Sequence, residues 1–138
     1  MPIEFINADL EITSSEDLTP IKEAFEQSSY EFVVMYCGEI AGGTYLASFE
    51  VHPDNLRDDQ SAAEKIHAFC DSIGQLQGFA KEVWNRAGKR VIDLGYQSDD
   101  HCEAFVDRIP LAAIRRLEEL RIELALTIYP KSPLTSDL

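Results

Sequence analysis

The clearest pattern of apolar and polar positions runs from Tyr30 to His52 and predicts a β-hairpin. An unbroken apolar run at 32–37 is rich in strand-forming residues, as is typical of a strand covered on most of its surface. Glycines between positions 38 and 43 supply the backbone freedom for a reversal. Apolar and polar residues then alternate from 44 to 51, as in a half-buried strand. We expect this hairpin near the middle of a sheet.

A strand and a helix are predicted before the hairpin. Residues 6–12 alternate as in a strand that either starts there or contains a bulge, because the apolar residues before them have the opposite phase. Between 18 and 28 the apolar residues recur every three to four positions, which predicts a helix. Ser15 or Asp17 is expected to cap it, because Pro20 is tolerated only in the first turn.

Two helices are predicted after the hairpin and a polar link. Ser61 precedes an apolar stripe over 62–76, and Glu64 follows at the spacing of a capping box. Residues 79–87 suit a brief helix, which Gly88 would end.

The last third of the chain predicts three strands and one helix. Residues 89–96 alternate as in a strand, and 102–109 are expected to pair with them across a polar reversal. A helix is expected to begin at Pro110. Residues 121–129 form the closing strand, and 131–138 are predicted to be a flexible tail.

The resulting order, β-α-β-β-α-(α)-β-β-α-β, predicts one α+β domain over residues 1–130. Paired strands interrupted by single helices favour a mainly antiparallel sheet of about six strands, with the helices packed on one face. The first four elements follow the ferredoxin-like order. Because the other sheet face is partly polar, we expect it to be available to a partner protein or to a second copy in a homodimer.

The charge is concentrated in the first half of the chain. The net charge is −13, and residues 1–60 hold 13 acidic residues against Lys22 and Arg57, a net of −11. This argues against nucleic acid and anionic membranes as partners, since both require clustered cations. It permits a basic protein partner, although solubility alone is an alternative explanation. The absence of a long apolar run and of a basic leader predicts a cytoplasmic protein.

The residue pattern offers little support for catalysis or metal binding. Cys37, Cys70 and Cys102 are scattered and are expected to be free thiols. His67 and Cys70 share a helix face, and Asp99–Cys102 cluster at a reversal; packing and a solvated turn are the favoured explanations, and metal binding stays open. No nucleophile elbow or phosphate-binding loop is present in the sequence. We therefore predict a protein that is not an enzyme and needs no cofactor.

Two stretches carry a resemblance to a known group of proteins. The segment VWNRAGKRVIDLGYQ, residues 83–97, resembles the W-x-x-A-x-x-R-x-x-D-x-G pattern of small bacterial proteins grouped as a domain of unknown function. The segment LEELRIELALTIYP, residues 117–130, is similar to the last helix and strand of that group, which ends in a T-x-Y motif. The corresponding positions are Trp84, Arg90, Asp93 and Gly95. Some members resemble immunity proteins encoded beside antibacterial toxins.

The leading functional prediction is a non-enzymatic immunity protein that occludes a secreted toxin domain through its acidic surface. The residues predicted to contact the partner are Asp9, Glu11, Glu16, Asp17, Glu23, Glu26, Glu31 and Glu39. The alternatives are a homodimeric structural subunit and a small-ligand- or metal-binding domain that uses Trp84, Arg90 and Asp93. We also expect Arg90 and Asp93 to share one face of their strand, where they would pair.

Overall fold

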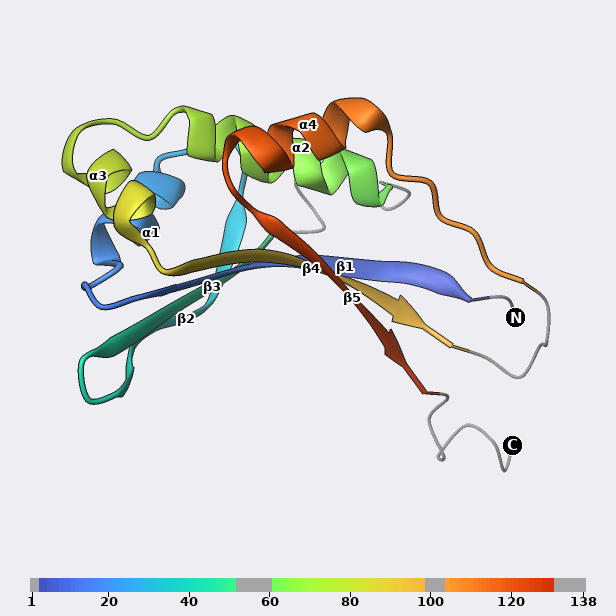
Figure 1. Ribbon diagram of the computed structural model, residues 1–138, viewed down its shortest axis with the longest axis horizontal. Coiled ribbons are helices and arrows are strands. Elements are labelled where there is room, and N and C mark those ends of the chain that lie inside the picture. The colour runs from blue at the N-terminus through green and yellow to red at the C-terminus, as the bar shows by residue number, and fades with distance from the viewer. Residues whose placement is uncertain (1–2, 52–60, 99–103, 131–138) are drawn as a thin grey trace.

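A five-stranded sheet carries all four helices of the described chain on one face (Figure 1). The computed structural model describes residues 3–51, 61–98 and 104–130. The elements in chain order are β1 (Glu4–Ser14), α1 (Thr19–Glu26), β2 (Phe32–Ala41), β3 (Thr44–Val51), α2 (Ala62–Gly74), α3 (Gly78–Arg86), β4 (Lys89–Gln97), α4 (Leu111–Glu119) and β5 (Glu123–Tyr129). The predicted α+β class is therefore confirmed.

The strand order is β2-β3-β1-β4-β5, so β1 occupies the centre of the sheet. β1 pairs antiparallel with β3 and β4, and β2 pairs antiparallel with β3. β5 runs parallel to β4 because α4 carries the chain back across the sheet between them. The prediction of about six strands was wrong, and the sheet is mixed. The hairpin was also misplaced, since β2 is an edge strand and exposes Met35 and Ile40.

The segment predicted as a strand over 102–109 forms none where it is described, from 104 onward. It lies against the end of β4 through side chains. The Phe105 ring meets the Tyr96 ring edge-on at 5.4 Å, and the Tyr96 hydroxyl donates to Asp107 Oδ2 at 2.6 Å. These contacts are made by Phe105 and Asp107, whereas Ala104 and Val106, which were expected to face inward, are exposed. β5 takes the place beside β4.

The core lies between the sheet and the helices. Leu10, Phe49 and Ile92 point from the three central strands toward the helices, where Phe69 of α2 and Val83 of α3 meet them, and all five side chains are fully buried. Burying side chains of this size stabilises the fold by about 1.5–3 kcal/mol each. The apolar positions of the alternating pattern are therefore those that point to the helix-covered face of the sheet.

Several local predictions are confirmed. Of the two alternatives for the first strand, the bulge is observed: β1 begins at Glu4, and its register against β4 shifts between Phe5 and Asn7. The predicted cap of α1 is wrong in position, because Leu18 is the N-cap residue and provides no side-chain bond; Asp17, one residue earlier, accepts hydrogen bonds from the amide and hydroxyl of Thr19. Ser61 Oγ accepts from the Glu64 amide at 3.2 Å. The Asp99–Cys102 cluster and the tail lie outside the described residues. No helix in the described part of the chain is both long and apolar enough to cross a bilayer.

Candidate functional site

A row of carboxylates crosses the open face of the sheet, which is the face opposite the four described helices. Asp9 lies between the buried residues Ala8 and Leu10 on β1, and it therefore points away from the core. Its partner on β3 is Glu50, and its partner on β4 is Asp93. Side chains directly opposite one another on adjacent strands have Cβ atoms about 4.5–5.5 Å apart. The three central strands thus place three acidic side chains side by side.

Two more acidic residues extend this row into a patch. Glu11 follows Asp9 on the same face of β1, and its partner on β4 is Val91. Val91 pairs in turn with Glu123 on β5, which places Glu123 in the same line. We call the patch the acidic face. It consists of Asp9, Glu11, Glu50, Asp93 and Glu123.

The ionised form of Asp9 is strongly disfavoured. Burial raises its pKa to about 6, with further increases from the charge of Glu50, a hydrogen bond shared with Glu50, and the charges of Asp93 and Glu11. The Oδ1 atom of Asp9 is buried and has no hydrogen-bond partner among the described residues. Asp93 has a partner, because the Thr127 hydroxyl lies 2.8 and 2.9 Å from its two oxygens and donates its one hydrogen to that carboxylate. Asp9 is therefore the residue of the acidic face at which the fold disfavours the ionised carboxylate.

Asp9→Asn should stabilise the protein above pH 6. Because the folded pKa of Asp9 lies above its ordinary value, the native state holds the proton more tightly than the unfolded chain. The stability contributed by this proton is full below about pH 4 and is lost as the pH rises through about 6. We expect Asp9→Asn, which mimics the protonated form, to raise the free energy of unfolding by about 1 kcal/mol at pH near 7.5, after allowance for solvent screening.

Urea unfolding of the wild type and Asp9→Asn at three pH values across this range measures the effect. The difference should shrink toward zero near pH 4. Glu26→Gln, on the exposed surface of α1, is the matched control and should show no such trend. A gain that is independent of pH would contradict the assignment to Asp9 ionisation.

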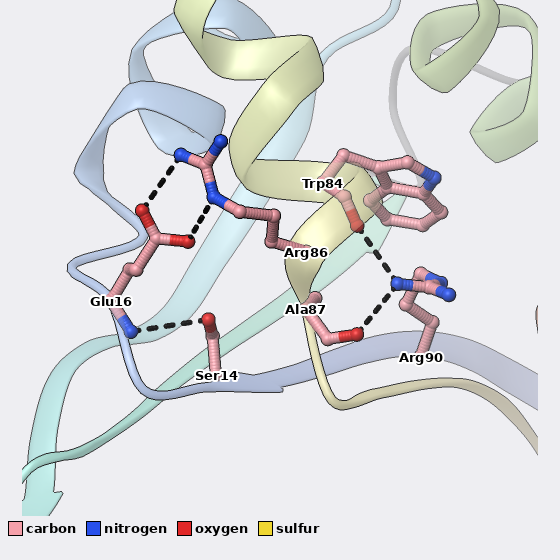
Figure 2. A network of polar contacts seen from close by, with 6 residues as sticks. All are labelled: Ser14, Glu16, Trp84, Arg86, Ala87 and Arg90. Atoms are coloured by element: carbon pink, nitrogen blue, oxygen red, sulfur yellow. Dashed lines mark hydrogen bonds and ion pairs between the residues drawn. The ribbon is translucent and has the colours of Figure 1, made fainter.

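The other predicted partner-binding acids lie away from the acidic face. Glu16 forms a bidentate ion pair with Arg86 of α3, at 2.7 and 2.8 Å (Figure 2). Asp17 is engaged with Thr19 at the start of α1. The remaining four are exposed along α1, before β2 and near the hairpin turn. They are Glu23, Glu26, Glu31 and Glu39.

The structure thus brings together only Asp9 and Glu11 of the predicted partner-binding set. It adds Glu50 and Glu123, which sequence reasoning did not select. Their polar phase within an alternating strand was visible in the sequence, but the strand order that joins them was not.

Arg90 anchors the opposite, helix-covered face of β4. Its Nη1 atom donates to the carbonyl oxygens of Trp84 and Ala87, both at 2.8 Å, and its Nε donates to the carbonyl oxygen of Arg121 at 3.2 Å. The guanidinium also lies over the Trp84 ring, 5.4 Å from its centroid (Figure 2). Arg90 therefore joins the end of α3 to the segment that leads into β5.

The expected pairing of Arg90 with Asp93 was wrong. The two residues are three apart on a strand, so their side chains point to opposite faces. Gly95, the last position of the resembling pattern, lies beneath the Asn7 side chain, and a Cβ atom there would overlap it. The pattern therefore combines residues that serve two different faces of the sheet.

Arg121 occupies a backbone conformation that usually requires glycine. Its φ angle is +58°. The Arg121 amide donates to the Glu118 carbonyl and the Ile122 amide donates to the Leu117 carbonyl, the two bonds of a Schellman motif that ends α4. A residue with a Cβ atom in this conformation costs about 1–2 kcal/mol.

Arg121→Gly should therefore raise the free energy of unfolding by about 1 kcal/mol, because it relieves this backbone strain. The charge of Arg121 also disfavours the charged form of Arg90, so its removal acts in the same direction. Arg121→Ala is the control, since it removes the charge but keeps the strain. Thermal and urea unfolding of the three proteins separates the two effects. Equal stability of the Gly and Ala variants would contradict the prediction that the backbone at Arg121 is strained.

His67 and Cys70 are held by packing and hydrogen bonding. Cys70 is fully buried in the core, and burial raises its pKa to about 11. His67 Nδ1 lies 3.1 Å from Arg116 Nη1, and Arg116 also pairs with Asp71 at 2.7 Å. Among the described residues no group of three His, Cys, Asp or Glu side chains could hold a metal ion. Cys37 and Cys70 are free thiols, as predicted.

Comparisons with protein-family models, with curated proteins and with solved structures found no match. The resemblance to immunity proteins therefore stays a prediction.

Proposed function

We propose that this chain is a binding protein whose acidic face takes a basic protein partner. The observation that carries the proposal is the juxtaposition of Asp9, Glu50 and Asp93 on the sheet face opposite the four described helices. Carboxylates this close repel one another, and the raised pKa of Asp9 reflects that repulsion together with burial. A lysine or arginine from a partner would reduce the repulsion between the carboxylates and would donate a hydrogen bond to the unpaired Oδ1 atom of Asp9.

The same face offers apolar contacts beside the charges. Leu46 of β3 and Val91 of β4 share it and are partly exposed. Exposed ion pairs contribute only about 0–1 kcal/mol each, so apolar anchors of this kind would supply much of the affinity. Two copies of this chain would oppose their acidic rows across the face, which disfavours homodimerisation there.

The partner class that we propose is a toxin domain with a basic active-site cleft. A cleft that binds an anionic substrate such as nucleic acid is lined by lysine and arginine. A flat surface with a central row of carboxylates can cover such a cleft and exclude the substrate. The charge of the chain and the resemblance of its Trp84–Gly95 segment both support this proposal.

Association with the partner should depend steeply on salt and on pH. Affinity capture from the native cell on the immobilised protein would supply the partner, and surface plasmon resonance would give the rates. We expect the association rate constant to fall at least about tenfold between 50 and 500 mM salt, because steering by charge is screened. Affinity should rise between about pH 5 and 7 as Asp9 ionises. Rates that are insensitive to salt would contradict the proposal.

A further inference from the structure

A cleft of about 510 Å³ lies in the helix layer, on the side of the sheet opposite the acidic face. The ends of α2, α3 and α4 and the start of β4 surround it. Its apolar lining includes Ile73, Trp84 and Leu120, and its cationic lining is Lys81, Arg90 and Arg121. A cleft of this volume falls within the range of about 300–1,000 Å³ that small ligands occupy.

The cleft is cationic although the chain as a whole is acidic. Three cations line it against one carboxylate, Glu119, in a protein of net charge −13. Burial lowers the pKa of Arg90, and the nearby charge of Arg121 lowers it further. Within the described part of the chain, the side chains of Lys81 and Arg121 make no hydrogen bond or ion pair. These two cations are therefore available to a ligand.

The ends of three helices bring partial negative charge close to these cations. A helix C-terminus carries about half a negative charge on its terminal carbonyl groups. Here several of those carbonyls already have donors. The Ser72 and Ile73 carbonyls accept amides at the end of α2, and the Leu117 carbonyl accepts one at the end of α4. At the end of α3, Arg90 satisfies the Trp84 carbonyl. Arg90 is therefore engaged by carbonyls at the end of α3, whereas the side chains of Lys81 and Arg121 are not engaged by the end of any described helix.

We propose that this cleft binds a small organic anion, in which a carboxylate or phosphate group is attached to a flat apolar body. The body would lie against Leu120 and the small accessible parts of Ile73 and Trp84, which are 3% and 4% exposed, and the anionic group would meet Arg121 and Lys81 at the mouth. Arg121 keeps its strained backbone conformation at a position where glycine would be more stable. Anion binding accounts for an arginine there. This site is independent of the acidic face and of its partner.

Trp84 makes the proposal directly testable, because it is the only tryptophan in the chain and lines the cleft. Its fluorescence, excited near 295 nm, would be followed during titration with phenyl phosphate, benzoate, phenol and inorganic phosphate. Saturable binding of phenyl phosphate or benzoate, at least about tenfold tighter than phenol and inorganic phosphate, is the expected result. A preference between the first two identifies the anionic group of the ligand.

Variants of the cleft provide the second arm. Arg121→Gly, which should fold at least as stably as the wild type, is expected to weaken anion binding at least about tenfold, and Lys81→Gln should weaken it in the same direction. Arg115→Ala removes an exposed cation of α4 outside the cleft and should change the affinity less than about twofold. No saturable response to either aromatic anion, equal binding of phenol, or unchanged affinity in Arg121→Gly would overturn the proposal.

Discussion

Arg90→Ala is expected to lower the free energy of unfolding by about 3 kcal/mol. The side chain donates to the backbone carbonyl oxygens of Trp84, Ala87 and Arg121, and it lies over the indole ring. The bonds to Trp84 and Ala87 are part-buried, the bond to Arg121 is exposed, and the Trp84 carbonyl keeps the Ala87 amide as a second donor. A hydrogen bond from a charged donor contributes about 1.5–3 kcal/mol, and a cation over an aromatic ring contributes about 0.5–2 kcal/mol more. The three carbonyls belong to two separate segments. Loss of the hydrogen bonds to them should therefore also weaken the packing of α3 against β4, the strand that follows it.

Urea unfolding with matched variants tests this prediction. Arg90→Lys keeps the charge but has no planar fork, so it should recover only a minor part of the loss. Arg86→Ala removes a neighbouring arginine whose ion pair with Glu16 is exposed, and it should cost far less. Hydrogen exchange should show faster opening of α3 in Arg90→Ala than in Arg86→Ala. Equal stability of the two alanine variants would contradict the anchoring role of Arg90.

The elements predicted from the sequence are those with strong local signals. Ser61 and Glu64 are three residues apart in the chain and cap α2 without any distant contact. The alternation around Leu10 and Ile92 marked the strands because each has one face in the core. Local periodicity therefore gave the class of the fold and most of its elements.

The arrangement of these elements depended on contacts that periodicity does not report. The segment around Phe105 alternates as a strand does, but its side chains lie on Tyr96 and β5 takes the backbone position beside β4. The apolar run of β2 suggested a covered strand, although β2 lies at the edge of the sheet. Strand order depends on which distant segments pair with one another, and local periodicity carries no information about that pairing.

The candidate site was predictable only in part for the same reason. Asp9 and Glu11 stood out as acidic residues on the polar phase of a strand. Glu50 and Asp93 join them only through the registers of β3 and β4 with β1. The role of Arg90 was harder still to predict from the sequence, because its acceptors are backbone carbonyls, which every residue provides. Sequence reasoning even placed Arg90 and Asp93 on one face, although their odd spacing puts them on opposite faces.

The second large effect is expected from neutralising the acidic face. The triple variant Asp9→Asn, Glu50→Gln and Asp93→Asn removes the three adjacent carboxylates and keeps side chains of nearly the same shape. Its affinity for the basic partner should fall at least about a hundredfold, since charge pairs in a desolvated interface are each worth about 1.5 kcal/mol or more. The variant should also be at least as stable as the wild type, because the repulsion at Asp9 is relieved.

A charge-matched variant separates this effect from the overall charge of the protein. Glu23, Glu26 and Glu82 are exposed on α1 and α3, in the helix layer on the covered side of the sheet. Replacing all three with glutamine removes the same number of charges and leaves the acidic face intact. Any loss of affinity from net charge alone would appear equally in both triple variants.

The most direct test of the proposed function is therefore the dissociation constant of the captured partner for these three proteins, measured by isothermal titration calorimetry in one buffer. The proposal predicts that the helix-layer variant binds within about threefold of the wild type while the acidic-face variant loses at least about a hundredfold. Equal affinities for the two variants, or a larger loss in the helix-layer variant, would contradict it.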